Sequence, residues 1–117
     1  MRLSESYLSA LLVLFGCSNH SVTFEGYFTY GHETSVFRQC NQMQYFWLNG
    51  EPKPMDIIDN ASLQLAEKLE EPYQKIYIKF SGFVEYREPV GFEEETDGII
   101  YMRELIEKSE SPPRHCK

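Results

Sequence analysis

The stretch YFWLNGEPKPMDIIDNASLQLAEKLEEPYQKIYIKF, residues 45–80, decides the fold. It runs from an aromatic strand pattern through a helical pattern into a second strand pattern, in which apolar and polar residues alternate. The helical part carries its apolar residues on one face, at Ile57, Ile58, Ala61, Leu65 and Leu69. We therefore predict one helix, near residues 57–70, between two strands.

Further strand patterns flank this stretch. Three short strands are predicted before the helix, over residues 22–30, 35–40 and 43–48, and two after it, over residues 75–86 and 98–106. Five strands with one helix between the third and the fourth is the plan of an OB-fold, a partly open Greek-key barrel. The predicted fold class is therefore mainly β, a five-stranded OB-fold-like Greek-key barrel. An open α+β sheet with the same element order is the alternative.

Local signals set the expected turns and the expected core. Asn49-Gly50 predicts a turn that ends the third strand, and Pro52 and Pro54 predict an extended connection to the helix. In the fourth strand, Ile76, Ile78 and Phe80 are predicted to share one face, and Tyr77 is predicted to share the other with the lysines two residues away on either side. The core candidates are the apolar residues predicted to face inward: Phe24, Phe37, Phe46, Leu48, Leu65, Leu69, Ile76, Ile78 and Ile100.

An apolar run near the start of the chain ends in Gly16-Cys17. It is shorter than the about 20 residues of a membrane-spanning helix, and its length suits the apolar part of a secretory signal. The box Leu14-Phe15-Gly16-Cys17 resembles the bacterial lipobox, whose cysteine takes a lipid after cleavage. The sequence predicts a cleaved signal peptide over residues 1–16 and a lipidated Cys17 in a tether over residues 17–21. An ordinary signal sequence, or a buried first helix with a chance cysteine, are the alternatives.

The chain is short and acidic. It has 117 residues and a formal net charge of −7, and this size suits one domain, predicted over residues 22–108 with a tail over residues 109–117. Nucleic-acid binding depends on Lys and Arg side chains that displace counterions, so the composition disfavours it. Attachment to a membrane is expected to come from the lipid rather than from charge. The acidic run over residues 93–97 is predicted to be a solvated loop, with a weak cation site as the alternative, although its spacing does not match an EF-hand.

Two cysteines remain if Cys17 carries the lipid. An oxidising envelope favours pairing of Cys40 with Cys116. The tail from Ser109 onward has no apolar pattern and would fray unless something held it. We therefore predict an intramolecular Cys40–Cys116 disulfide, with two free thiols, or pairing of Cys116 with another chain, as the alternatives.

No arrangement of residues indicates catalysis. Cys40 with His32 would be a nucleophile and its base, but a structural half-cystine is the more common role, so the protein is predicted not to be an enzyme. No cofactor and no metal site are assigned, because the soft side chains that suit Cu(I) are scattered along the chain. These side chains are His20, His32, His115, Met43, Met55, Met102 and two cysteines.

One candidate binding surface follows from the predicted fold. OB-folds bind ligands on the outer face of their second and third strands, often through aromatic side chains. Alternation places Tyr45 and Trp47 on one face of the third strand, and His32 and Glu33 in the first turn would lie at the rim. Packing of Tyr45 and Trp47 under a loop or in the core is the alternative.

Several motifs resemble the C-terminal OB-fold domain of NlpE-type bacterial lipoproteins: FTYGHE at 28–33, VFRQC at 36–40, YFWL at 45–48 and PYQKIYIKFSG at 72–82. The resemblance implies an envelope lipoprotein. By this resemblance, Cys40 corresponds to one cysteine of a disulfide in that domain, and Cys116 corresponds less directly to its partner. The sequence shows no counterpart of the N-terminal barrel domain of NlpE or of its metal-associated Cys-x-x-Cys, so surface sensing, envelope-stress signalling and copper handling are not carried over.

The predicted function combines these observations. We expect a small lipoprotein of the bacterial cell envelope, anchored in the outer membrane and facing the periplasm. It is expected to be a non-catalytic binding or sensing module for an envelope protein or a cell-wall component. The alternative is an envelope protein that binds a small ligand or copper.

Overall fold

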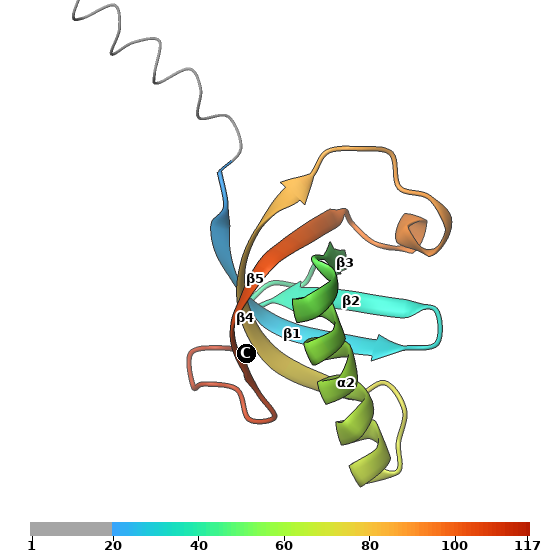
Figure 1. The fold of residues 1–117 in the computed structure, drawn as a ribbon, viewed down its shortest axis with the longest axis vertical. Coiled ribbons are helices and arrows are strands. Elements are labelled where there is room, and N and C mark those ends of the chain that lie inside the picture. Colours follow the sequence, from blue (N-terminus) through green and yellow to red (C-terminus); the bar gives the residue numbers. More distant parts are fainter. Residues whose placement is uncertain (1–19) are drawn as a thin grey trace, which may run out of the picture.

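Residues 20–117 are described by a computed structural model, in which five strands form a closed barrel with one long helix packed against it (Figure 1). The predicted signal peptide and Cys17 lie outside the described residues. The prediction of a mainly β barrel with one helix between the third and fourth strands is confirmed. The elements are, in order, β1 (Val22–Gly31), β2 (Thr34–Gln39), β3 (Phe46–Gly50), α2 (Pro52–Leu69), β4 (Lys75–Glu85), the short 3₁₀ helix η1 (Gly91–Glu95) and β5 (Ile99–Ser109).

The strands pair in the order β1-β2-β3-β5-β4, and β4 closes the barrel against β1. The β3–β5 pair is parallel and the other pairs are antiparallel. The strand β1 pairs with both β2 and β4, and Gly26 lies where it contacts both. A Cβ atom at Gly26 would lie 2.1 Å from the carbonyl oxygen of Arg38, so glycine permits this close approach.

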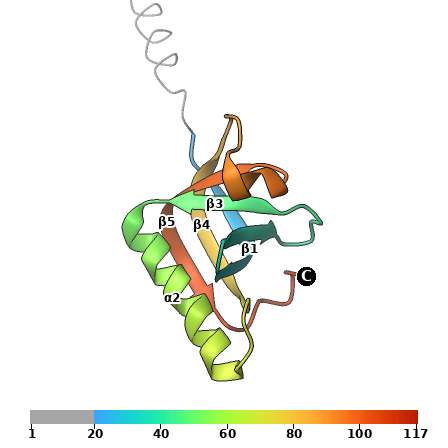
Figure 2. The same ribbon diagram turned by 90° about the vertical axis from the view of Figure 1, so that its right-hand side faces the viewer.

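The helix α2 begins at Pro52, five residues before its predicted start, so the prediction of an extended connection is wrong. Pro52 and Pro54 both lie in the first turn of the helix. Backbone N–H groups in a first turn have no partner inside the helix, so proline loses no hydrogen bond there. Figure 2 shows the helix lying obliquely along one side of the barrel.

The turn predicted at Asn49-Gly50 is also wrong, because both residues belong to β3. Asn49 pairs with Tyr101 and Gly50 with Met102 in the parallel β3–β5 ladder. A Cβ atom at Gly50 would lie 2.8 Å from the Met102 carbonyl oxygen. Glycine therefore serves the approach of two strands here and not a reversal of the chain.

The barrel interior contains most of the predicted core. Phe46 is only partly buried and packs against the core cluster, and Leu69, with 52% of its surface exposed, is a wrong core prediction. Leu69 is the last residue of α2. The confirmed core residues are Phe24, Phe37, Leu48, Leu65, Ile76, Ile78 and Ile100, and Phe28, Ile58, Phe80 and Met102 join them.

Tyr77 is buried although its neighbours in sequence, Ile76 and Ile78, belong to the core cluster. The hydroxyl of Tyr77 donates a hydrogen bond to the Glu25 carboxylate, and His115 Nε2 lies 2.9 Å from Glu25 Oε1. The tail thus reaches the outer face of β1 and β4, which is the face on which alternation predicted Tyr77. Burial raises the pKa of Tyr77. The hydrogen bond that Tyr77 donates is the main reason that the pKa of Glu25 is lowered.

A disulfide joins Cys40 to Cys116, with an S–S distance of 2.00 Å and a sequence separation of 76. This is the intramolecular pairing among the alternatives left open by the sequence. The Tyr27 hydroxyl donates to the Cys116 carbonyl oxygen at 3.0 Å, and Asn41 Nδ2 donates to the His115 carbonyl oxygen at 2.9 Å. Side chains of β1 and of the β2 end therefore hold the tail in addition to the covalent bond.

Candidate functional site

A groove of about 300 Å³ lies on the outer face of β2 and β3. One wall is the turn between β1 and β2, and the other is the loop of residues 86–98 between β4 and β5. Both segments project from the same side of the barrel in Figure 1. We call this hollow the aromatic–acidic groove, after the side chains that line it, chiefly Glu33, Val36, Tyr45, Trp47, Phe92 and Glu95.

Three of the four predicted binding residues meet in the groove. Trp47 lies on β3 and is half-buried, and Tyr45 precedes β3 and is 52% exposed, which excludes a core position for Tyr45. Glu33 comes from the two-residue turn that joins β1 to β2. His32 does not line the groove but lies at its rim, with Nε2 3.1 Å from Glu33 Oε1.

The loop of residues 86–98 supplies residues that the sequence analysis missed. Phe92 and Glu95 belong to η1, and Thr96 follows it. The sequence did contain one signal: Phe92 is an apolar residue next to a run of acids and is 46% exposed. A single exposed apolar residue is common on protein surfaces, so this signal alone does not mark a contact surface, and the residues that Phe92 meets in the groove could not be read from local pattern.

Glu93 holds this loop in place, so the prediction of a purely solvated acidic run is wrong at this residue. Its two carboxylate oxygens accept hydrogen bonds from Arg87 Nη1 and Nη2, each at 2.8 Å. The Val90 backbone N–H donates to it at 3.0 Å and Asn49 Nδ2 at 3.3 Å. With 9% exposure, Glu93 is nearly enclosed by these donors. The Arg87 guanidinium is the main reason that the pKa of Glu93 is lowered to about 2.

The same contacts fix the aromatic floor of the groove. The indole Nε1 of Trp47 donates to Asn49 Oδ1 at 3.1 Å, so Asn49 links Trp47 to Glu93. Tyr45 is fixed through its backbone, because Asp97 N donates to Tyr45 O at 2.8 Å and Tyr45 N donates to Asp97 Oδ2 at 3.0 Å. The Trp47 indole and the Tyr45 backbone are therefore positioned before any ligand arrives, which lowers the entropic cost of binding.

Comparison with known protein families, curated proteins and solved structures finds no significant match to this chain. Its function is therefore inferred from the side chains and their arrangement alone.

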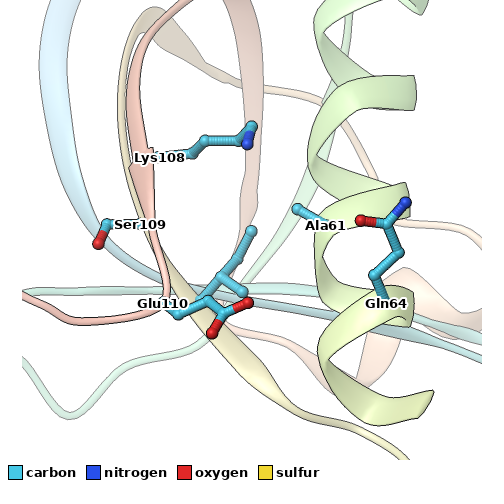
Figure 3. A pocket seen from close by; sticks show the side chains of 6 residues that line it. Ala61, Gln64, Lys108, Ser109 and Glu110 are labelled. Atoms are coloured by element: carbon cyan, nitrogen blue, oxygen red, sulfur yellow. The ribbon is translucent and has the colours of Figure 1, made fainter. Parts of the chain in front are cut away.

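Neither of the next two hollows is lined by any of the four predicted binding residues. The pocket in Figure 3 lies between α2 and β5, is lined by Ala61, Gln64 and Lys108 among others, and has a volume of about 80 Å³. Pockets for small ligands usually begin near about 300 Å³. A wider hollow of about 830 Å³ is lined by residues 84–89 and 96–99 and by Phe46, and Thr96 borders both this hollow and the groove. The loop of residues 86–98 thus has a hollow on two of its sides.

The structure bears on the catalytic and metal-binding roles that were considered for Cys40. Cys40 is bonded to Cys116, so in this state it is neither a free nucleophile beside His32 nor a thiolate ligand for copper. Within residues 20–117, no three or more His, Cys, Asp or Glu side chains gather as metal ligands would. No helix in the described part of the chain is long and apolar enough to cross a bilayer.

Proposed function

We propose that this protein is a non-catalytic binding module of the bacterial cell envelope, which contacts an envelope protein or a cell-wall component through the aromatic–acidic groove. One observation carries the proposal: Glu33, Tyr45 and Trp47, from separate segments, meet Phe92 in one hollow. The outer face of strands two and three, between these two loops, is where OB-folds bind their ligands.

The location is part of the same proposal. The apolar run that ends in Gly16-Cys17 supports a lipid anchor on Cys17, and Ser18 at the next position favours the outer membrane. Intact-mass measurement of protein from the membrane fraction tests this. A diacyl or triacyl group on Cys17 supports it, and full recovery of Cys17→Ser in the same fraction contradicts it.

A photo-crosslinking residue tests the groove as the binding face. We place it at Thr34, which lines the groove, and in a control at Glu67, an exposed residue near the end of α2. A discrete crosslinked species that forms in intact cells from position 34 and not from position 67 supports the proposal. Equal crosslinking from both positions, or none from position 34, contradicts it.

A further inference from the structure

The aromatic–acidic groove combines two kinds of side chain that together attract cations. Its rings come from Tyr45, Trp47 and Phe92, and its carboxylates from Glu33 and Glu95. The face of an aromatic ring is electron-rich, and a cation placed over it is attracted most strongly where water is displaced. No lysine or arginine is among the lining residues of this groove.

The four acids around the groove divide into two pairs. Glu93 and Asp97 are used by the fold, because Glu93 binds Arg87 and Asp97 binds the backbone of Tyr45. Glu95 has no ion pair with any residue in the range 20–117, and Glu33 has only exposed His32. The negative charge that lines the groove is therefore left for a ligand.

The aromatic rings of the described chain also fall into two groups, those with a cation–π partner and those without one. Cation–π contacts in the described chain all use rings outside the groove: Arg38 and Lys75 lie over Tyr27, each 4.9 Å from its centroid, and Arg103 lies 5.0 Å from the centroid of Phe83. Tyr45, Trp47 and Phe92 have no such partner among residues 20–117. The groove thus holds rings without a cation–π partner and two carboxylates with no Lys or Arg partner, of which Glu33 contacts only the exposed imidazole of His32.

We infer that the groove binds a basic segment of a partner protein, with a Lys or Arg side chain lying against Trp47 between Glu33 and Glu95. This inference rests on the proposed function and names the chemistry of its partner. A neutral glycan would use the same rings for stacking and could donate hydroxyl hydrogen bonds to the carboxylates, but it would leave their two charges uncompensated. Charge complementarity between an acidic groove and a basic segment also speeds association and makes it salt-dependent.

Trp47 provides a direct test, because it is the only tryptophan in the chain and lines the groove. The full chain is titrated with a synthetic peptide of alternating Lys, Arg and Ser, and the emission of Trp47 is followed. The matched peptide carries acetyl-lysine and citrulline, which keep the shapes and remove the charges. We expect the basic peptide to change the Trp47 emission in a saturable way. The neutral peptide should bind at least about tenfold more weakly, and added salt should weaken binding of the basic peptide.

Two double variants separate groove chemistry from net charge. Glu33→Gln with Glu95→Gln removes the two carboxylates of the groove, and Glu67→Gln with Glu71→Gln removes two exposed acids at the far end of α2. Both pairs change the net charge by the same amount. We expect the groove pair to weaken binding of the basic peptide about tenfold. The control pair should weaken it by less than about twofold. Equal weakening by the two pairs overturns the inference.

The remaining outcomes distinguish this inference from the proposed function. Tight binding of chitotetraose without binding of the basic peptide shows that the ligand is a glycan and overturns the inference alone. If no peptide binds but position 34 crosslinks a partner, the groove is the binding face and its cationic ligand class is wrong. If position 34 also fails to crosslink, both statements are wrong.

Discussion

The side-chain amide of Asn49 joins Trp47 to Glu93: Asn49 Oδ1 accepts from the indole Nε1 at 3.1 Å, and Asn49 Nδ2 donates to Glu93 Oε2 at 3.3 Å. Trp47 and Asn49 lie on β3, and Glu93 lies in the loop between β4 and β5. A strand in the barrel wall and a loop far along the chain are thereby coupled at the groove. Five consequences of this and of other contacts can be measured.

Glu93→Gln is expected to loosen the loop that walls the groove. The substitution keeps the shape of the side chain and removes the charge that Arg87 binds with two hydrogen bonds. Loss of charged hydrogen bonds of this kind costs about 1–3 kcal/mol. We expect a corresponding fall in the free energy of unfolding and a red shift of Trp47 emission. Glu94→Gln, an exposed neighbour, is the control and is expected to change neither.

The same carboxylate predicts a response to acid. The pKa of Glu93 is lowered from 4.5 to about 2, so its stabilising contribution is fully present above pH 4.5 and is lost as the pH falls toward 2. Wild-type protein should show a change of Trp47 emission in this range that Glu93→Gln lacks. Identical acid titrations of the two proteins would show that Glu93 does not hold the loop.

Asp59→Asn is expected to stabilise the protein at neutral pH. Asp59 Oδ1 is buried without a hydrogen-bond partner among residues 20–117, and burial, followed by the charge of Asp56, raises the pKa of Asp59 to about 6. The folded protein therefore holds this proton more tightly than the unfolded chain, and its stability decreases as the pH rises from about 4 to about 6. Urea unfolding should find the variant more stable at pH 7 and equal to wild type near pH 3.5. Asp56→Asn should give a smaller gain, and a destabilised Asp59→Asn at pH 7 contradicts the prediction.

Removing the disulfide is expected to release the tail and leave the barrel folded. Cys40 and Cys116 are 76 residues apart, and a cross-link of this length contributes on the order of 4 kcal/mol through the unfolded chain. In the double Ser variant, trypsin should cleave after Arg114 sooner than in wild type, while the far-ultraviolet circular dichroism stays unchanged. A tail that remains protected from trypsin would show that the contacts of Tyr27 and Asn41 are sufficient to hold it.

Ile78→Ala tests the register of β4. Ile78 has no exposed surface, and truncation of a fully buried isoleucine costs about 2–5 kcal/mol. Leu69→Ala, at a residue that is 52% exposed, should stay within about 0.5 kcal/mol of wild type. Urea unfolding of the two variants measures both values, and a loss below about 0.5 kcal/mol for Ile78→Ala would place this side chain outside the core.

The fold could be predicted because strand alternation and one helical face are local properties of the sequence. Predictions from local pattern failed where contacts with other parts of the fold determine the environment of a residue. Gly50 looked like a turn residue, but the approach of Met102 explains it. Tyr77 lies on the outer face of β4, as alternation predicts, but its burial could not be read from alternation, because its hydrogen-bond partner Glu25 comes from β1 and is itself contacted by His115 of the tail. Leu69 fits the helical period, yet lies at the end of a helix that extends past the core.

The candidate site was predicted on one side only. Tyr45, Trp47 and Glu33 follow from alternation and from the position of the first turn in the fold. The opposite wall could not be predicted, because hydrogen bonds from Arg87 and Asn49 to Glu93 set the path of the loop. Those bonds join residues that no periodic pattern relates, so Phe92 and Glu95 could not be assigned to the groove from sequence.

The two walls of the groove differ in how much sequence change they can absorb. The turn at His32-Glu33 has two residues, the shortest common hairpin connection, so a deletion there would disturb the pairing of β1 with β2. The opposite wall is a long loop between Glu85 and Ile99 that lies outside the barrel ladder. Insertions and exchanges in that loop would reshape the groove while leaving every strand in register. Diversification of the ligand, in evolution or in a designed library, would therefore proceed through this one loop.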